Sequence, residues 1–146
     1  FVYVGSSIKE TPIFAVEVSR RCRLAWWCFK RYRKGLYNRS GAQLEQKIRM
    51  LKVEVIEALL YRRTTGTTLK PHYSLLRKTH QWMLLRVTGY GRNPRTNHVA
   101  SYHDVLELVG CEGIGATLRR RTLLWARSVV RSAAKHLHRH VMFGEL

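Results

Sequence analysis

Apolar residues recur every three or four positions over most of the chain, which is the spacing of one face of an α-helix. The first such stretch begins at Thr11-Pro12, a typical helix start, and ends near Leu36. Its apolar stripe consists of Phe14, Val18, Cys22, Ala25, Phe29, Tyr32 and Leu36. The opposite face is basic and carries one tryptophan: Arg20, Arg23, Trp27, Lys30, Arg31 and Lys34. This pattern predicts a long helix with one buried side and one charged side.

Two more helices are predicted in the next fifty residues. Ser40 and Gln43 have the spacing of a capping box, which would open a helix at Ser40. The apolar stripe expected for this helix is wide and consists of Leu44, Ile48, Leu51, Val55 and Leu59, with Val53, Ile56 and Leu60 beside them. A third helix is expected over 69–88 and ends at Gly89. Its predicted inner residues are Tyr73, Leu76, His80, Met83, Leu84 and Val87.

The last third of the chain predicts a polar loop over 89–101 and two helices. Ser101 and Asp104 form a second capping-box pattern, opening a short helix that Gly110 ends. The final helix is expected over 114–134, with inner residues Ile114, Leu118, Trp125 and Val129. Before the first helix, residues 1–5 favour a β-strand with no evident partner in the chain. The predicted fold is therefore mainly α: a helical bundle of about five helices with a short N-terminal β-strand.

Charge is the unusual feature of the composition. The chain has 146 residues with 27 Lys and Arg against 9 Asp and Glu, a formal net charge of +18. Such an excess indicates a polyanionic partner, most often nucleic acid. Two groups of residues are therefore candidate nucleic-acid contacts: the basic face of the first helix, and the triplet Arg119, Arg120 and Arg121 of the last, of which Arg121 is expected to lean inward. The alternative is a solvated charged surface with Trp27 buried against another element.

Several classes of site have no support in the sequence. Asp104 is the only aspartate, which is a poor supply of carboxylates for a two-metal phosphoryl-transfer site. No nucleophile elbow or phosphate loop occurs, so we expect no catalytic residues and no metal site here. The alternate histidines of 136–140 are interpreted as a basic tail, and the three cysteines as reduced thiols of an intracellular, nuclear or cytoplasmic, protein. We expect no membrane span.

An ordered set of short motifs resembles the reverse transcriptase of non-LTR retrotransposons, from the end of the palm into the helical thumb. The stretch FVYVGSSI at 1–8 is similar to the F-x-Y-L-G-S-x-I turn of that family's primer grip. The pattern VEVxxR at 16–21 resembles the first thumb helix, and LLY at 59–61 the end of the next. The stretch ATLRRRTLLW at 116–125 resembles the family's last helical segment. Two departures stand out: Arg62-Arg63 after LLY, and Gly113 and Gly115 before the last helix.

The resemblance implies a segment that holds a template–primer duplex against a polymerase site. Tyr3, Val4 and Gly5 would press on the primer end as a primer-grip-like turn. The chain would divide into the end of the palm (1–10), a thumb-like region (11–88), a loop (89–101) and a C-terminal helical region with a basic tail (102–146). The strand would be left from a palm sheet missing here. RNA/DNA template–primer and the upstream palm and fingers would be its partners.

The resemblance places the catalytic aspartates upstream of this chain. No cofactor is expected in these residues, although the parent polymerase would need Mg²⁺. RNA-directed DNA synthesis is therefore expected of a longer enzyme to which this chain contributes, and a first residue of Phe1 suggests a piece of something longer. Two alternatives stay open. One is a decayed retroelement relic, and the other is a stand-alone basic helical module that binds nucleic acid or protein.

Overall fold

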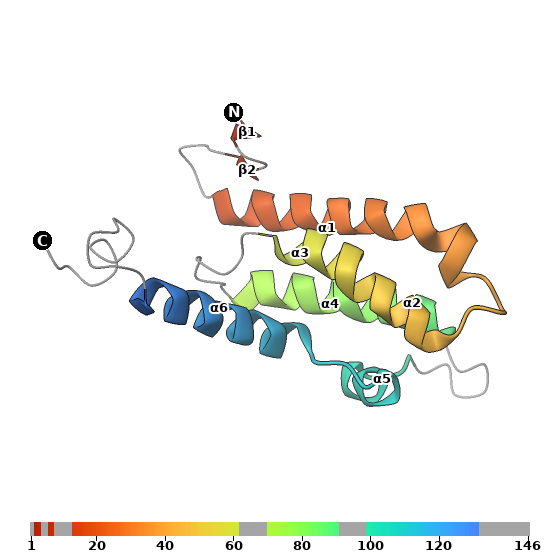
Figure 1. The fold of residues 1–146 in the computed structure, drawn as a ribbon. Coiled ribbons are helices and arrows are strands. Elements are labelled where there is room, and N and C mark those ends of the chain that lie inside the picture. The colour runs from red at the N-terminus through yellow and green to blue at the C-terminus, as the bar shows by residue number, and fades with distance from the viewer. Residues whose placement is uncertain (1, 4–5, 8–12, 62–69, 91–98, 132–146) are drawn as a thin grey trace, which may run out of the picture.

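A computed structural model describes residues 2–3, 6–7, 13–61, 70–90 and 99–131, and these are mainly α-helical (Figure 1). The helical elements are α1 (Ile13–Tyr32), η1 (Arg33–Tyr37), α2 (Leu44–Met50), η2 (Leu51–Ile56), α3 (Glu57–Leu60), α4 (Lys70–Thr88), α5 (Tyr102–Val109) and α6 (Ile114–Arg131). The η elements are π-helical turns that continue the helices before them, so the described part of the chain forms five helical rods, as predicted.

The rods are stacked in three tiers (Figure 1). Helix α1 lies over the rod formed by α2, η2 and α3 and over α4, and it contacts both. Helices α5 and α6 pack on α4 from the side away from α1. Helix α4 therefore lies at the centre of the bundle, and one of its faces meets α1 while another meets α6.

The N-terminal strand was expected to have no partner within the chain, and this expectation was wrong. Strand β1 (Val2–Tyr3) pairs antiparallel with β2 (Ser6–Ser7), and Val2 is opposite Ser7. The described part of the predicted strand is therefore paired, through two residue pairs, with a second short strand of the same chain.

The stripe predicted for the first helix forms the core beneath α1. Val18, Cys22, Ala25 and Phe29 are all buried. The helical spacing thus correctly identified the inner face. The helix does not stop at a cap, because η1 continues it and buries Tyr37, whose ring stacks on Phe29 with 4.5 Å between the ring centroids.

The second rod differs from its prediction at two points. Its helix begins at Leu44 with Gln43 as the N-cap, and no side chain caps it. The expected capping box is absent because Gln43 is extended, with φ of −63° and ψ of 143°, and Ser40 therefore lies before the helix in a turn whose Ala42 N–H donates to the Arg39 carbonyl. Further along, Val53 is 58% exposed although the predicted stripe included it. Val53 lies two residues from both Leu51 and Val55, which places it on the opposite side of the helix from these buried residues.

Leu44 was also expected inside and is instead exposed. The rest of the predicted stripe is buried, and its members are Ile48, Leu51, Val55, Ile56, Leu59 and Leu60.

The caps predicted in the last third of the chain are confirmed. Ser101 and Asp104 form a reciprocal capping box at the start of α5. Gly110 ends α5 in the left-handed conformation, with φ of 61°. Helix α6 buries Ile114, as expected, whereas Trp125 is only half-buried. Residues 132–134, predicted to extend this helix, lie outside the described residues.

A buried polar contact joins α4 to the start of α6. The Tyr102 hydroxyl accepts a hydrogen bond from the Ile114 N–H at 2.9 Å and lies 2.7 Å from Nδ1 of His80. The hydroxyl can donate its one proton to Nδ1, the arrangement in which a neutral imidazole carries its own proton on Nε2. His80 is 5% exposed, and this burial lowers its pKa to about 4.

None of the three cysteines forms a disulfide in the structure, and Cys22 is the buried one. Within the described ranges, no helix is long and apolar enough to cross a lipid bilayer.

Candidate nucleic-acid interface

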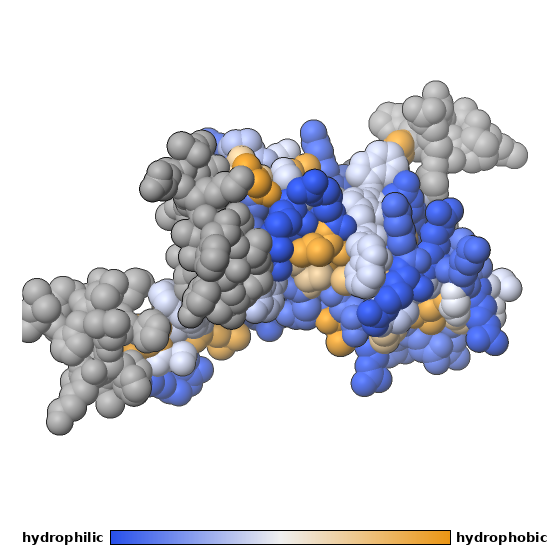
Figure 2. All heavy atoms as spheres, turned by 90° about the horizontal axis from the view of Figure 1, so that it is seen from above, coloured by the Kyte–Doolittle hydropathy of each residue, from blue (hydrophilic) through white to orange (hydrophobic). Residues whose placement is uncertain are grey.

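An open groove of about 560 Å³ runs between α1 with η1 and the C-terminal half of α4. It is lined by Arg23, Trp26, Trp27, Phe29, Lys30, Arg33 and Arg86. Four of these are cations and three are aromatic. Figure 2 looks down on the α1 side of the molecule, where hydrophilic side chains cover much of the face and smaller apolar areas lie between them. The groove thus combines the two residue classes that nucleic-acid surfaces use.

Trp26 joins the two walls of the groove. Its ring meets Phe29 edge-on, with centroids 5.5 Å apart and an interplanar angle of 75°. The guanidinium of Arg86, from α4, lies over the same ring at 4.7 Å from its centroid. A cation over an indole face is held by the ring quadrupole. Arg86 is therefore positioned at the groove by α1 as well as by its own helix.

Trp27 is 61% exposed. The alternative in which Trp27 is buried against another element is therefore wrong. Large aromatic side chains are usually well covered in soluble proteins. An indole left open between Arg23 and Lys30, which lie four residues before it and three residues after it, can stack on a planar ligand.

The charge of the groove is not compensated within the described part of the chain. Arg23, Lys30, Arg33 and Arg86 take part in no ion pair among these residues, and no Asp or Glu lines the groove. Like charges in one concave surface repel each other and attract an anion. The groove is thus a site of concentrated positive potential with an exposed aromatic surface.

The remaining basic residues predicted on the first helix have different surroundings. Arg20 donates to Glu17 at 2.9 Å and 3.0 Å, and hydrogen bonding to that carboxylate raises the pKa of Arg20. Arg31 lies 3.9 Å from Glu54. Lys34 is exposed. The predicted face therefore divides: Arg23, Trp27 and Lys30 line the groove, whereas Arg20 and Arg31 contact carboxylates.

Four lining residues were not among the predicted contacts, and one of them, Phe29, was predicted in the apolar stripe of the first helix. Trp26 and Arg33 belong to the predicted first helix, but periodicity placed neither on its basic face. Arg86 was not singled out because nothing local in the third helix indicates that it reaches α1. Only the packing of α4 against α1 brings these residues together.

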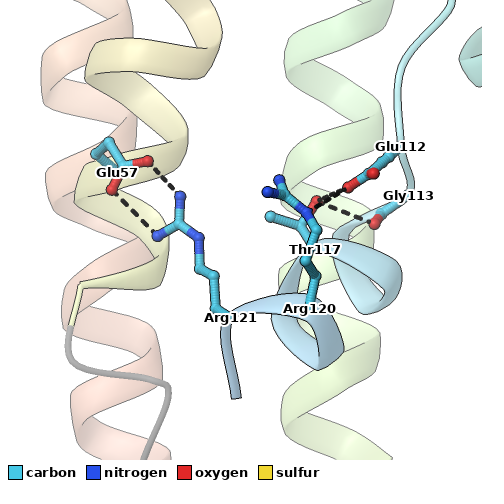
Figure 3. Close-up of polar contacts among 6 residues, drawn as sticks. All are labelled: Glu57, Glu112, Gly113, Thr117, Arg120 and Arg121. Carbon is cyan, nitrogen blue, oxygen red and sulfur yellow. Dashed lines mark hydrogen bonds and ion pairs between the residues drawn. The ribbon is translucent and has the colours of Figure 1, made fainter. Parts of the chain in front are cut away.

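The arginine triplet of α6 mostly contacts the protein itself (Figure 3). Arg121 leans inward, as predicted, and binds both carboxylate oxygens of Glu57 on α3. Arg120 lies 3.4 Å from Glu112, in the turn before α6. Arg119 is exposed and has no ion pair with any described residue. Two of the three arginines are thus engaged by carboxylates of the protein: Arg121 links α6 to α3, and Arg120 contacts the turn before its own helix.

The other predicted sites add little to this interface. Of the primer-grip-like residues, Tyr3 lies in β1, and Val4 and Gly5 lie outside the described residues. Over the described ranges, no three His, Cys, Asp or Glu side chains gather so that they could hold a metal ion.

Comparison with known proteins gives no relative. No protein-family model, no curated protein and no solved structure matches this chain. The function of the groove is therefore inferred from its own residues and their chemistry.

Proposed function

We propose that the groove between α1 and α4 binds the sugar–phosphate backbone of a nucleic acid. One observation carries the proposal: four cations and an exposed tryptophan share a concave surface that no described carboxylate lines. Lysine and arginine neutralise phosphates and release condensed counterions, which supplies most of the affinity for nucleic acid. The net charge of +18 supports the same class of partner.

In its specific form, the proposal is that the chain is the template–primer-binding segment of a retrotransposon reverse transcriptase. The order of short motifs along the sequence supports it, as does the helical character expected of a thumb. The chain would contribute to RNA-directed DNA synthesis without the catalytic carboxylates. The Mg²⁺ ions and the polymerase site would belong to the palm of the longer enzyme.

A second candidate is a stand-alone module that binds another protein. It is favoured by a different surface, the C-terminal half of α6, where Leu123, Leu124 and Val130 are each more than half exposed. A decayed relic is the remaining alternative, and it would keep the fold without binding.

The salt dependence of binding tests the proposal. A labelled RNA–DNA hybrid is titrated with the protein between 50 and 300 mM salt, and binding is followed by fluorescence anisotropy. If Z phosphates are neutralised, log affinity falls against log salt with a slope of about −0.9Z, so four groove cations predict a slope of roughly −3 to −4. Absence of binding at low salt, or a slope near zero, would contradict the proposal.

A pair of matched variants locates the contact. Arg23→Ala with Lys30→Ala removes two groove cations, whereas Arg127→Ala with Arg131→Ala removes two exposed cations of α6. The net charge changes equally in both. We expect the groove variant to lower the slope by about 2 and to weaken binding equally for all sequences, since phosphate contacts carry no base information. Equal weakening by both variants would contradict the assignment to the groove.

A further inference from the structure

A second exposed tryptophan lies on α4, close to the groove. Trp82 is 51% exposed and lies four residues before Arg86, whose guanidinium lines the groove. Lys78 lies four residues earlier still and is also exposed. Residues spaced by four lie on one face of a helix, about one turn apart. Lys78, Trp82 and Arg86 therefore form a continuous basic and aromatic edge that extends the groove along α4.

The two helices present the same combination of side chains on either side of the groove. On α1, the exposed Trp27 has Arg23 and Lys30 as its helical neighbours, and on α4 the exposed Trp82 has Lys78 and Arg86. The stacked pair of Trp26 and Arg86 connects the two helices.

The charge of this surface is one-sided along both helices. Helix α4 contains no Asp or Glu. Helix α1 contains one, Glu17, and that carboxylate is bound by Arg20 and Arg21. A neutral or cationic partner would gain nothing from such a surface, whereas a polyanion would.

Solvent-exposed indole rings favour single-stranded over double-stranded nucleic acid. In a duplex the bases are stacked on each other and paired, so a protein on the outside meets mainly phosphates and sugars. An unpaired base offers its π-face to an aromatic side chain, and this stacking tolerates any sequence. Two exposed tryptophans among cations are therefore suited to a strand whose bases are not paired.

We propose that the surface formed by Lys78, Trp82 and Arg86 together with the groove binds single-stranded nucleic acid, with phosphates on the cations and unpaired bases on Trp27 and Trp82. This inference rests on the general form of the proposed function, binding of the sugar–phosphate backbone in the groove, and not on its template–primer form; it narrows the substrate from nucleic acid in general to unpaired strands. At 1.5 Å per residue, the side of the groove formed by α1 and η1 is about 15 Å long from Arg23 to Arg33. This length accommodates a few nucleotides of a single strand.

The test compares three ligands of known chemistry by fluorescence anisotropy at one low salt concentration. They are a 12-nucleotide RNA single strand, a strand of the same length in which the bases are absent, and a blunt 12-base-pair RNA–DNA hybrid. The protein is used as the full chain. The single strand and the abasic strand carry the same backbone charge, so the difference between them measures the contribution of the bases.

The variants are Trp27→Ala, Trp82→Ala and the conservative Trp27→Phe, with Leu123→Ala on α6 as an exposed control outside the surface. Each tryptophan-to-alanine change should weaken binding of the RNA strand by roughly 5- to 100-fold, the range that stacking of one base gives. The abasic strand and the hybrid should bind all variants alike, and Trp27→Phe should recover much of the lost affinity. Circular dichroism of each variant checks that it is folded.

Each outcome supports or overturns one of the two proposals. Tight, salt-dependent binding that no tryptophan variant changes would overturn the single-strand inference and leave the phosphate-binding proposal standing. The same holds if the hybrid and the RNA strand lose affinity equally. If none of the three ligands binds at low salt, the proposed function itself fails.

Discussion

Lowering the pH from 7 to 4 should destabilise the protein through His80, whose imidazole is buried between α4 and α5. Burial lowers its pKa from 6.5 to about 4, and Nδ1 lies 2.7 Å from the Tyr102 hydroxyl. Between these two values the unfolded chain binds a proton at this histidine and the folded chain does not. Stability is therefore complete above pH 6.5 and is lost as the pH falls toward 4.

The size of this effect follows from the two pKa values. One pKa unit corresponds to about 1.36 kcal/mol, so a fall from 6.5 to about 4 corresponds to about 3 kcal/mol. Domains of this size unfold with about 5–15 kcal/mol, so the loss is a substantial fraction of the total. His80 is 5% exposed, and solvent does little to reduce the effect.

His80→Asn isolates this contribution. The asparagine amide oxygen can accept the Tyr102 hydrogen bond but does not titrate. Free energies of unfolding are measured by urea denaturation with far-UV circular dichroism at pH 4, 5, 6 and 7. We expect the native protein to lose about 3 kcal/mol more than the variant over this range. The carboxylates of Glu57 and Glu112, which line the cavity beside His80, are present in both proteins and cancel in the difference.

Parallel losses of stability in the two proteins would refute this reasoning. A direct measurement complements the unfolding data if the variant is too unstable to compare. The imidazole resonances of His80 should remain those of the neutral Nε2–H tautomer down to pH 5 in the folded protein. Protonation near pH 6.5 would contradict the burial argument.

Three further substitutions test individual contacts through thermal and urea unfolding. Gly115→Ala should cost about 1–3 kcal/mol, because the new Cβ would lie 2.6 Å from the Tyr73 hydroxyl, and adding Tyr73→Phe should recover part of the loss. Ser101→Ala should cost about 1 kcal/mol by removing the N-cap of α5, and an unchanged stability would refute the cap. Arg121→Ala should cost less than about 1 kcal/mol, because its partner Glu57 is 56% exposed, and a larger loss would show a different role.

Local patterns in the sequence predicted local structure well. The inner face of α1 followed from helical spacing alone, since Val18 and Phe29 are buried as their positions require. The capping box at Ser101 was predicted by the same kind of reasoning. The similar pattern at Ser40 failed because the helix begins only at Leu44, after an extended Gln43, and the sequence pattern does not reveal this later start.

The groove could be predicted only in part, because one of its walls depends on how two helices pack. Trp27 was expected on a basic face, and it is exposed there. Arg86 lies 60 residues after Trp26 in the chain, and its contact with the Trp26 ring depends on how α4 packs against α1. Where the two helices meet, Thr79 Oγ1 lies 3.4 Å from Cys22 Sγ, a contact that has no signature in either helix alone.

The placement of the few carboxylates decides what each arginine does. Where an acidic side chain is near, as for Arg21 beside Glu17 or Arg121 beside Glu57, the arginine links parts of the fold. Along the groove no described carboxylate is present, and Arg23 and Arg86 keep their full charge toward solvent. Only five arginines take part in ion pairs among the described residues, so most of the positive charge on those residues is not paired with a carboxylate there. The uncompensated groove cations repel each other in the free protein, and a bound polyanion would relieve that repulsion.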